Sequence, residues 1–210
     1  MGILDSIKQA ITGEQDPEHT EHDHTGPERH EFSPEAYSAA LESQRAEKDH
    51  FFKHHPYSPL EERSGFTGLD YYPPDPAYRF SLPLQQAEQP EELILQTSTG
   101  DEQPFVRLGT VEFEVEGQPA RLAVYQSAHH DDLFMPFRDA TSGRETYGAG
   151  RYLEPVELAG DKLLVDFNLA YNPYCAYSEN YSCPLPPVEN HLKVPIRAGE
   201  KAYKKADTVL

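Results

Sequence analysis

Cysteine, positive charge and long apolar runs are all scarce in this sequence. Two cysteines, Cys175 and Cys183, are too few for a disulfide scaffold, and in a reducing compartment they default to thiols. No stretch approaches the ~20 apolar residues that span a bilayer, and the N-terminus lacks a basic region followed by an apolar run. We therefore expect a cytoplasmic protein with no membrane partner.

Basic residues are outnumbered two to one. The chain has 18 Lys and Arg against 36 Asp and Glu, a formal net charge of -18. Because such a surface repels phosphate backbones, we expect no nucleic-acid partner. The acid excess fits a protein from a high-salt proteome as well as an ordinary acidic cytosolic protein. No P-loop, dinucleotide glycine fingerprint or serine nucleophile elbow is present, so no cofactor is predicted.

The composition also bounds the domain organisation. Hydrophobic residues make up 37% of the 210 residues, and 19 Pro and 13 Gly indicate many turns. We expect one β-rich domain at 32–203 and a tail at 204–210. The spacing of apolar residues in 1–12 predicts a short amphipathic helix, and 13–31 is an acidic, His-containing linker predicted to be disordered.

Regular structure is predicted to start at Ser33-Pro34-Glu35, which offers a capping hydroxyl, a first-turn proline and an acid at the positive helix end. The helix should run over about 34–53 and pack against the outside of a sheet. Residues 57–90 are rich in proline and aromatic residues, which predicts an ordered irregular wrap.

From residue 92 onwards the hydrophobic period changes to two. The segment 111–116 alternates strictly between apolar and acidic residues, and Gly117-Gln118 predicts a hairpin turn. No βαβ alternation is present, so the sequence predicts a mainly β fold, an antiparallel sandwich or barrel with one N-terminal flanking helix. The predicted strands are 93–97, 105–108, 110–116, 120–126, 133–137, 151–158, 162–169 and 191–196.

Unusual residue choices are concentrated near the C-terminus. They lie in Pro136-Phe137-Arg138-Asp139-Ala140-Thr141-Ser142-Gly143, in Thr146-Tyr147-Gly148-Ala149-Gly150-Arg151-Tyr152-Leu153 and in 166–201, which includes Cys183-Pro184-Leu185-Pro186-Pro187-Val188-Glu189-Asn190 and Pro195-Ile196-Arg197-Ala198-Gly199-Glu200-Lys201. Together they closely resemble the archaeal and bacterial family called domain of unknown function 1684, over roughly 34–201. The resemblance implies membership of an uncharacterised family and carries no activity with it.

The same C-terminal block predicts a ligand site. Most of the negative charge lies before residue 133, whereas three arginines and many tyrosines fall within the motifs. Arginine binds carboxylate or phosphate in a bidentate manner, and tyrosine provides aromatic walls with a polar tip. The residues predicted to bind a ligand are Arg138, Asp139, Tyr147, Arg151, Asn172, Cys175, Cys183, Glu189, Asn190 and Arg197.

Each of these residues also has an alternative interpretation. The arginines could pair with Asp139, Asp166, Glu189 or Glu200 and brace loops, with the tyrosines in the core. Cys175 and Cys183 could be packed thiols, a short-loop disulfide, half of a metal site or, for one of them, a nucleophile. His129-His130-Asp131-Asp132 is interpreted as a surface turn, with a metal site as the alternative, so no metal ligand is predicted.

The leading functional hypothesis is the binding of a small anionic or polyhydroxylated ligand in a pocket of the C-terminal block. One alternative is a hydrolase- or lyase-type enzyme that uses Asp139 or Glu189 in that pocket. Another is a structural or partner-binding protein. The sequence leaves open whether a reaction is catalysed, which ligand binds and which oligomeric state the protein adopts.

Overall fold

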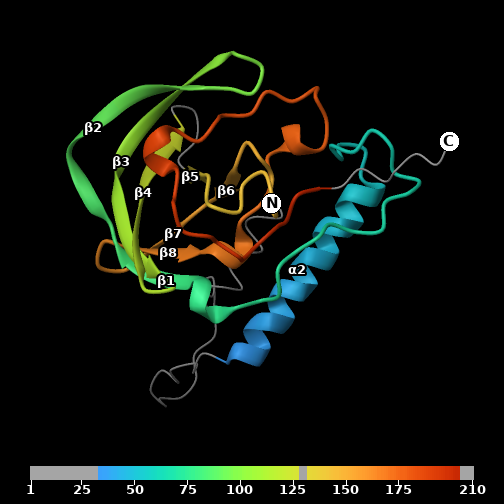
Figure 1. Cartoon of the computed structure of the whole chain (residues 1–210), viewed down its shortest axis with the longest axis horizontal. Helices are drawn as coiled ribbons and strands as arrows, with labels where there is room; N and C mark the ends of the chain where they lie inside the picture. Colours follow the sequence, from blue (N-terminus) through green and yellow to red (C-terminus); the bar gives the residue numbers. More distant parts are fainter. Residues whose placement is uncertain (1–32, 128–131, 204–210) are drawn as a thin grey trace, which may run out of the picture.

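A computed structural model of the chain describes residues 33–127 and 132–203. Within them the fold consists of two antiparallel sheets and one long helix (Figure 1), which confirms the mainly β prediction. The segments predicted at 1–12, 13–31 and 204–210, and the His129-His130 turn, lie outside the described residues. No helix within the described ranges is long and apolar enough to cross a membrane.

The helix α2 (Pro34–His54) begins where the sequence predicts. The side chain of Ser33 accepts a hydrogen bond from the backbone N–H of Ala36 at 3.2 Å, and Pro34 lies in the first turn, where no helical N–H is needed. Leu41 and Phe52 are its buried side chains.

The first turns of α2 contact the smaller sheet, where the hydroxyl of Tyr37 donates to Asp166 at 2.6 Å, and the rest of the helix contacts irregular segments. Arg45 donates hydrogen bonds to the backbone carbonyls of Tyr72 and Asn168, and Lys48 pairs with Glu200. These partners lie in irregular segments, and Figure 1 shows such segments between the helix and the sheets. The helix therefore anchors the irregular half of the molecule, which reaches it through backbone carbonyls and one buried carboxylate.

The larger sheet has the strand order β2-β3-β4-β5-β6. Its strands are β2 (Gln85–Gln96), β3 (Glu102–Val115), β4 (Gln118–Ser127), β5 (Leu133–Phe137) and β6 (Arg151–Leu153). The alternation predicted at 111–115 is observed as alternately buried and exposed residues in β3. Glu116 and Gly117 turn the β3–β4 hairpin with φ values of 50° and 75°, both in the left-handed region that such a two-residue turn requires.

The smaller sheet has the order β1-β8-β7, with β1 (Arg79–Pro83), β7 (Val156–Leu158) and β8 (Lys162–Asp166). β1 lies inside the segment predicted to be an irregular wrap. The single strand predicted at 151–158 is split at Pro155, so that β6 joins the larger sheet and β7 the smaller one.

Two predicted strand ends also differ from the structure. β8 stops at Asp166, whose carboxylate accepts the N–H of Asn168 at 3.0 Å and caps the 3₁₀ turn η2 (Phe167–Leu169). The segment 191–196 is irregular, with bends at Lys193 and Val194, and within it only His191 forms a bridge, with Arg138. Pro195 contributes no N–H to a continuing ladder.

The main hydrophobic core lies between the two sheets. It includes Val111 and Leu122 from the larger sheet, Val165 from the smaller sheet and Phe167 from η2, all of them 0% exposed. Ile196 and Ala198 from the C-terminal segment complete it. The C-terminal block thus contributes core residues, and its polar side chains are held at the boundary of this core.

Candidate functional site

Arg151 is the most deeply buried cation of the C-terminal block, with only 1% of its surface exposed. Its guanidinium donates to the carbonyl of Ile196 at 2.7 Å, to the carbonyl of Glu200 at 3.1 Å and to the carbonyl of Ala198. It also pairs with Asp139 at 3.2 Å. Burial lowers the pKa of Arg151, and the charge of Asp139 opposes that shift. Arg151 therefore clamps the 196–200 segment onto β6.

Asp139 is the acid of this clamp, and both of its oxygens are engaged. Oδ2 accepts the N–H of Ile196 at 2.6 Å as well as Nη2–H of Arg151 at 3.2 Å. Oδ1 accepts the N–H and the hydroxyl of Thr141, at 3.1 and 2.7 Å, and the hydroxyl of Ser142 at 3.2 Å. With five donors around it, this carboxylate braces the turn after β5 and has no free position for proton transfer to a ligand.

Arg197 points to a different environment. It is 48% exposed and forms a bidentate pair with Glu145, with N–O distances of 3.0 and 3.1 Å. Glu145 also accepts the hydroxyl of Tyr72 at 2.9 Å, and the Arg197 and Tyr72 hydrogen bonds lower the pKa of Glu145. Arg197 thus takes part in a surface contact, not in the buried clamp.

Arg138 is the third arginine of the motifs, and it differs from the other two. It is half-buried at the end of β5, where its N–H donates to the carbonyl of Asn190 and its carbonyl accepts the N–H of Leu192. Its guanidinium forms no ion pair or side-chain hydrogen bond with any described residue. Among the described arginines that are not fully exposed, it alone has no carboxylate or carbonyl partner for its guanidinium.

Glu189 and Asn190 lie together in the 3₁₀ turn η4 (Val188–Asn190) but face different partners. Glu189 accepts the hydroxyl of Tyr125 at 2.5 Å and pairs with Arg107 at 3.1 Å. Asn190 is 0% exposed and bonds to backbone groups of β4 and β5. Both side chains therefore fasten η4 to the larger sheet.

Asn172 belongs to another polar cluster, centred on Glu200, which is 1% exposed. Glu200 accepts the N–H of Asn172 at 2.8 Å and the hydroxyl of Tyr177 at 2.7 Å, and it pairs with Lys48 of α2. Sequence reasoning did not assign Glu200 and Lys48 to the site. The only signal was that Glu200 lies in the Pro195–Lys201 motif, because the identity of its partner on a helix 152 positions away depends on tertiary structure.

The two cysteines do lie together, as the sequence allowed. The N–H of Cys175 points to the sulfur of Cys183 at 3.4 Å, and the hydroxyl of Tyr147 lies 3.8 Å from the Cys175 sulfur. Both cysteines are free thiols, Cys175 half-exposed and Cys183 buried. Within the described ranges no group of three or more His, Cys, Asp or Glu side chains could hold a metal ion, so the pair has no described partners for a tetrahedral site.

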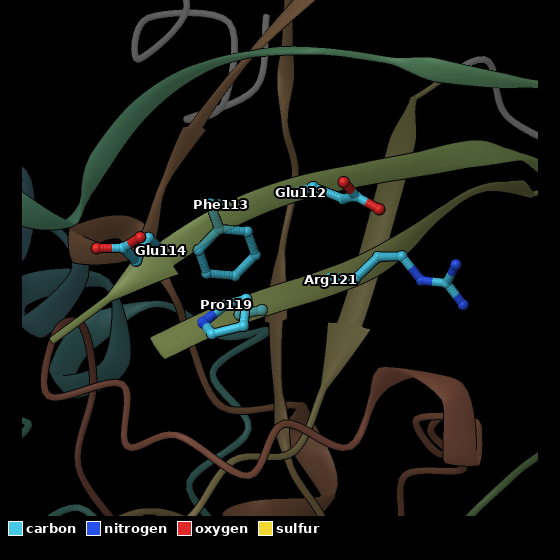
Figure 2. Close-up of a pocket in the computed structure, with 6 residues that line it drawn as sticks. Glu112, Phe113, Glu114, Pro119 and Arg121 are labelled. Atoms are coloured by element: carbon cyan, nitrogen blue, oxygen red, sulfur yellow. The ribbon is translucent and has the colours of Figure 1, made fainter. Parts of the chain in front are cut away.

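Two surface depressions lie away from these residues. One, of about 550 Å³, is lined by Glu112, Phe113, Glu114, Pro119, Ala120 and Arg121 on the β3–β4 hairpin, and Figure 2 shows these side chains spread along the two strands. A second, of about 370 Å³, is lined by Asp49, Thr67, Gly68, Leu69, Asp70, Ala202 and Tyr203. Neither is lined by any of the ten residues predicted to bind a ligand.

Asp49, in the second depression, is a residue that the sequence did not single out. Its pKa is raised, mainly by burial. Its Oδ1 accepts the N–H of Leu69 at 2.9 Å, which fastens the 67–70 segment to α2. A left-handed Gly68 (φ 133°) makes this close approach feasible, because a Cβ there would lie 2.9 Å from the Asp49 carboxylate.

A comparison with family models decides the classification. The model described as Protein of unknown function (DUF1684) matches residues 64–201, more than half of the chain. The chain belongs to this family. The match begins after α2, so it extends less far towards the N-terminus than the predicted 34–201.

The chain is also similar to a solved structure. The solution NMR structure of an uncharacterised protein from Haloarcula marismortui is 39% identical to the chain, with a TM-score of 0.62, and the match covers 80% of this chain and 95% of that one. Its organism is weakly consistent with the halophilic interpretation of the acid excess. No curated protein matches the chain.

The predicted site residues thus fall into separate groups. Asp139 and Arg151 form the buried clamp, Tyr147 meets the two cysteines, and Glu189 with Asn190 fastens η4. Asn172, Arg138 and Arg197 each have other surroundings. The bracing interpretation fits Arg151 and Arg197, whereas Arg138 is the motif arginine whose guanidinium has no carboxylate or carbonyl partner among the described residues.

Proposed function

We propose that this DUF1684 protein binds a small anionic molecule at the surface around Arg138. The observation that carries the proposal is the unpaired guanidinium of this half-buried side chain, in a protein with twice as many acidic as basic residues. A partly desolvated charge without an opposite charge costs free energy, so its retention favours a function for the charge.

The backbone around Arg138 holds the side chain in place. The residue is hydrogen-bonded on both sides, to Asn190 and to Leu192. Its aliphatic stem packs on Gly150, where a Cβ would lie 3.0 Å from the Arg138 Cγ and 2.6 Å from the carbonyl oxygen of Phe137. Gly150 is left-handed (φ 110°), so both its backbone conformation and its lack of a side chain are needed here. The guanidinium is therefore presented from a fixed base, which lowers the entropic cost of binding.

The chemical class of the ligand follows from the geometry of the Arg138 guanidinium. A guanidinium binds carboxylate or phosphate oxygens through two parallel hydrogen bonds, and the large negative charge elsewhere on the protein would repel an anion that lacks this contact. We expect one anionic group per ligand, with affinity that decreases as salt rises.

The test is thermal stabilisation of the wild-type protein by a panel of anions, comprising inorganic phosphate, sulfate, citrate and sugar phosphates. At least one should raise the melting temperature, and Arg138→Gln should remove that rise while leaving the melting temperature of the free protein nearly unchanged. Arg144→Gln is the matched control, because Arg144 is exposed and also has no described acidic partner. An equal rise in Arg138→Gln and wild type, or no rise with any anion of the panel, would contradict the proposal.

The enzyme alternative has no supporting observation. Asp139 is surrounded by five donors, and Glu189 is bound to Tyr125 and Arg107. The structural alternative is favoured by one observation, the saturation of Arg151 by three carbonyls and an acid. If the C-terminal block serves only as a brace, Arg138→Gln will leave every property of the protein unchanged, including its response to anions.

A further inference from the structure

Cys175 and Cys183 are held close together by two independent parts of the fold. Cys175 lies in the 3₁₀ turn η3 (Tyr174–Ala176), which is closed by the N–H of Tyr177 bonding to the carbonyl of Tyr174 at 3.0 Å. Cys183, eight positions later, is buried and 8% exposed. The N–H of Cys175 points to the Cys183 sulfur at 3.4 Å.

The position of Cys183 is set by the turn between β2 and β3. The N–H of Cys183 donates to the Ser98 hydroxyl at 3.1 Å, and its carbonyl accepts the N–H of Ser98 at 2.8 Å. Thr97 forms a bridge with Pro184, the next residue along the chain. Because each cysteine is tied to a different element, their closeness is a property of the folded domain and not of a flexible loop.

The two thiols differ in both exposure and acidity. Hydrogen bonds from the Cys183 thiol, the Tyr147 hydroxyl and the Ser98 hydroxyl lower the pKa of Cys175 to about 6, although partial burial opposes the shift. The same contact with Cys175, together with burial, raises the pKa of Cys183. The charge of the pair therefore resides on Cys175, the more exposed residue, and the proton on the buried Cys183.

We propose that Cys175 and Cys183 form a reversible thiol redox pair, in which a hydroperoxide oxidises Cys175 and Cys183 then closes an intramolecular disulfide. The division of roles follows from burial: Cys175 is partly exposed and meets the oxidant, whereas Cys183 is buried and is less accessible to it.

The chemistry balances in two steps. The Cys175 thiolate attacks one oxygen of the hydroperoxide, the O–O bond breaks, and the products are a sulfenic acid and an alkoxide, or a hydroxide when hydrogen peroxide is the oxidant. The Cys183 sulfur then attacks the Cys175 sulfur, an S–S bond forms, and the sulfenic oxygen leaves as water with the proton of Cys183. The two sulfurs lose two electrons in total, and the peroxide bond accepts them. A dithiol reductant returns both sulfurs to thiols by exchange.

The decisive experiment adds one equivalent of hydrogen peroxide to the reduced full-length protein at neutral pH, followed by alkylation and intact mass measurement. Wild type should lose the mass of two hydrogen atoms, take up no alkyl group and form no disulfide between two chains, and dithiothreitol should restore both thiols. Peptide mapping should find the Cys175–Cys183 link.

Two single variants separate the roles of the sulfurs. In Cys183→Ser, Cys175 should form a sulfenic acid that dimedone traps. In Cys175→Ser, the buried Cys183 should react at least about tenfold more slowly. Circular dichroism checks that both variants fold.

Several outcomes would overturn the proposal. They are two thiols that both remain alkylatable after peroxide, a disulfide between two chains in place of one within the chain, and equal reaction rates for the two single variants. One equivalent of zinc bound to the purified reduced protein would also overturn it, because the thiols would then be metal ligands.

Discussion

The carboxamide of Asn190 bonds to both backbone groups of Ala123, accepting its N–H at 2.7 Å and donating to its carbonyl at 3.0 Å. Strands β4 and β5 pair at Tyr125–Phe134, and the same register sets Ala123 opposite Pro136. Pro136 has no N–H, so the ladder cannot continue there. The side chain of Asn190 takes the place of the missing β5 partner of Ala123, and it also donates to the Pro136 carbonyl at 2.8 Å. One side chain thus replaces the missing backbone partner.

We expect Asn190→Ala to destabilise the protein by about 3 kcal/mol, because it leaves three buried backbone groups without partners. Urea unfolding measures the change, and Asn180→Ala is the control, since Asn180 is exposed and should change stability by less than about 0.5 kcal/mol. Equal effects of the two substitutions would show that water can hydrogen-bond to the backbone groups of Ala123 and Pro136 when the Asn190 side chain is removed.

Arg151→Met should cost about 4 kcal/mol, because it leaves the buried carboxylate of Asp139 without its opposite charge and removes the Arg151 donors from three carbonyls. The double variant Arg151→Met/Asp139→Asn should lose less than the sum of the two single variants, since each single change strands the other partner. Chemical denaturation of all four proteins completes the cycle. If the losses in the free energy of unfolding were strictly additive, Arg151 and Asp139 would not stabilise each other, which would contradict the clamp.

Arg197→Ala tests an exposed arginine of the same motifs, for comparison with the buried Arg151. Its partner Glu145 is also exposed, and a solvent-exposed pair contributes little to stability. We expect a small change in the urea midpoint, far below that of Arg151→Met, and a change that disappears at high salt. A loss comparable to that of Arg151→Met would mean that Arg197 holds the C-terminal segment in place.

The tyrosines predict how stability depends on alkaline pH. Burial raises the pKa of many of them, to about 12 for Tyr72 and Tyr147 and further for Tyr171 and Tyr177. A raised pKa in the folded state means that stability is intact below the unfolded value near 10 and falls as pH rises above it. The urea midpoint should therefore fall above about pH 10, and phenolate absorbance should rise together with unfolding. Full tyrosine ionisation in the folded protein at about pH 10 would contradict this prediction.

The thiol pair predicts a second pH profile. In reduced wild type, the rate of alkylation of Cys175 by iodoacetamide should rise with a midpoint of about pH 6, because its pKa is lowered to that value. Cys183→Ala removes the largest cause of the shift, so its midpoint should move up towards that of an ordinary thiol. Tyr147→Phe should move it in the same direction by less. An unchanged midpoint in Cys183→Ala would show that the hydrogen bond between the thiols is absent.

Residues 1–31 remain predicted to be dispensable for folding, because 13–31 has too little apolar surface to offset the entropy of ordering. A chain that begins at Phe32 keeps the Ser33 cap of α2 and should melt within a few degrees of the full chain. Calorimetry of both proteins is the test. A larger loss would show that the segment 1–12 docks on the domain.

Local features were predictable from the sequence because they depend on neighbours along the chain. The alternation at 111–116 specifies a strand with one buried face, and Ser33-Pro34 specifies the first turn of a helix, whatever surrounds them. The family could be identified for the same reason, since long motifs are read directly from the sequence. Even the failure at 151–158 has a local cause, because Pro155 interrupts the run.

Tertiary structure decided which of the motif side chains are free. Nothing in the sequence distinguishes Arg138 from Arg151, yet folding surrounds one with carbonyls and an acid and leaves the other without a described partner. Likewise, the spacing of Cys175 and Cys183 allows several chemistries, and only the deeper burial of Cys183 and its contact with the N–H of Cys175 make the two thiols unequal. The physical reason is that the ionisation free energy of a charged group or a thiol depends on desolvation and on partners from distant segments. Neither can be inferred from the neighbouring residues in the sequence.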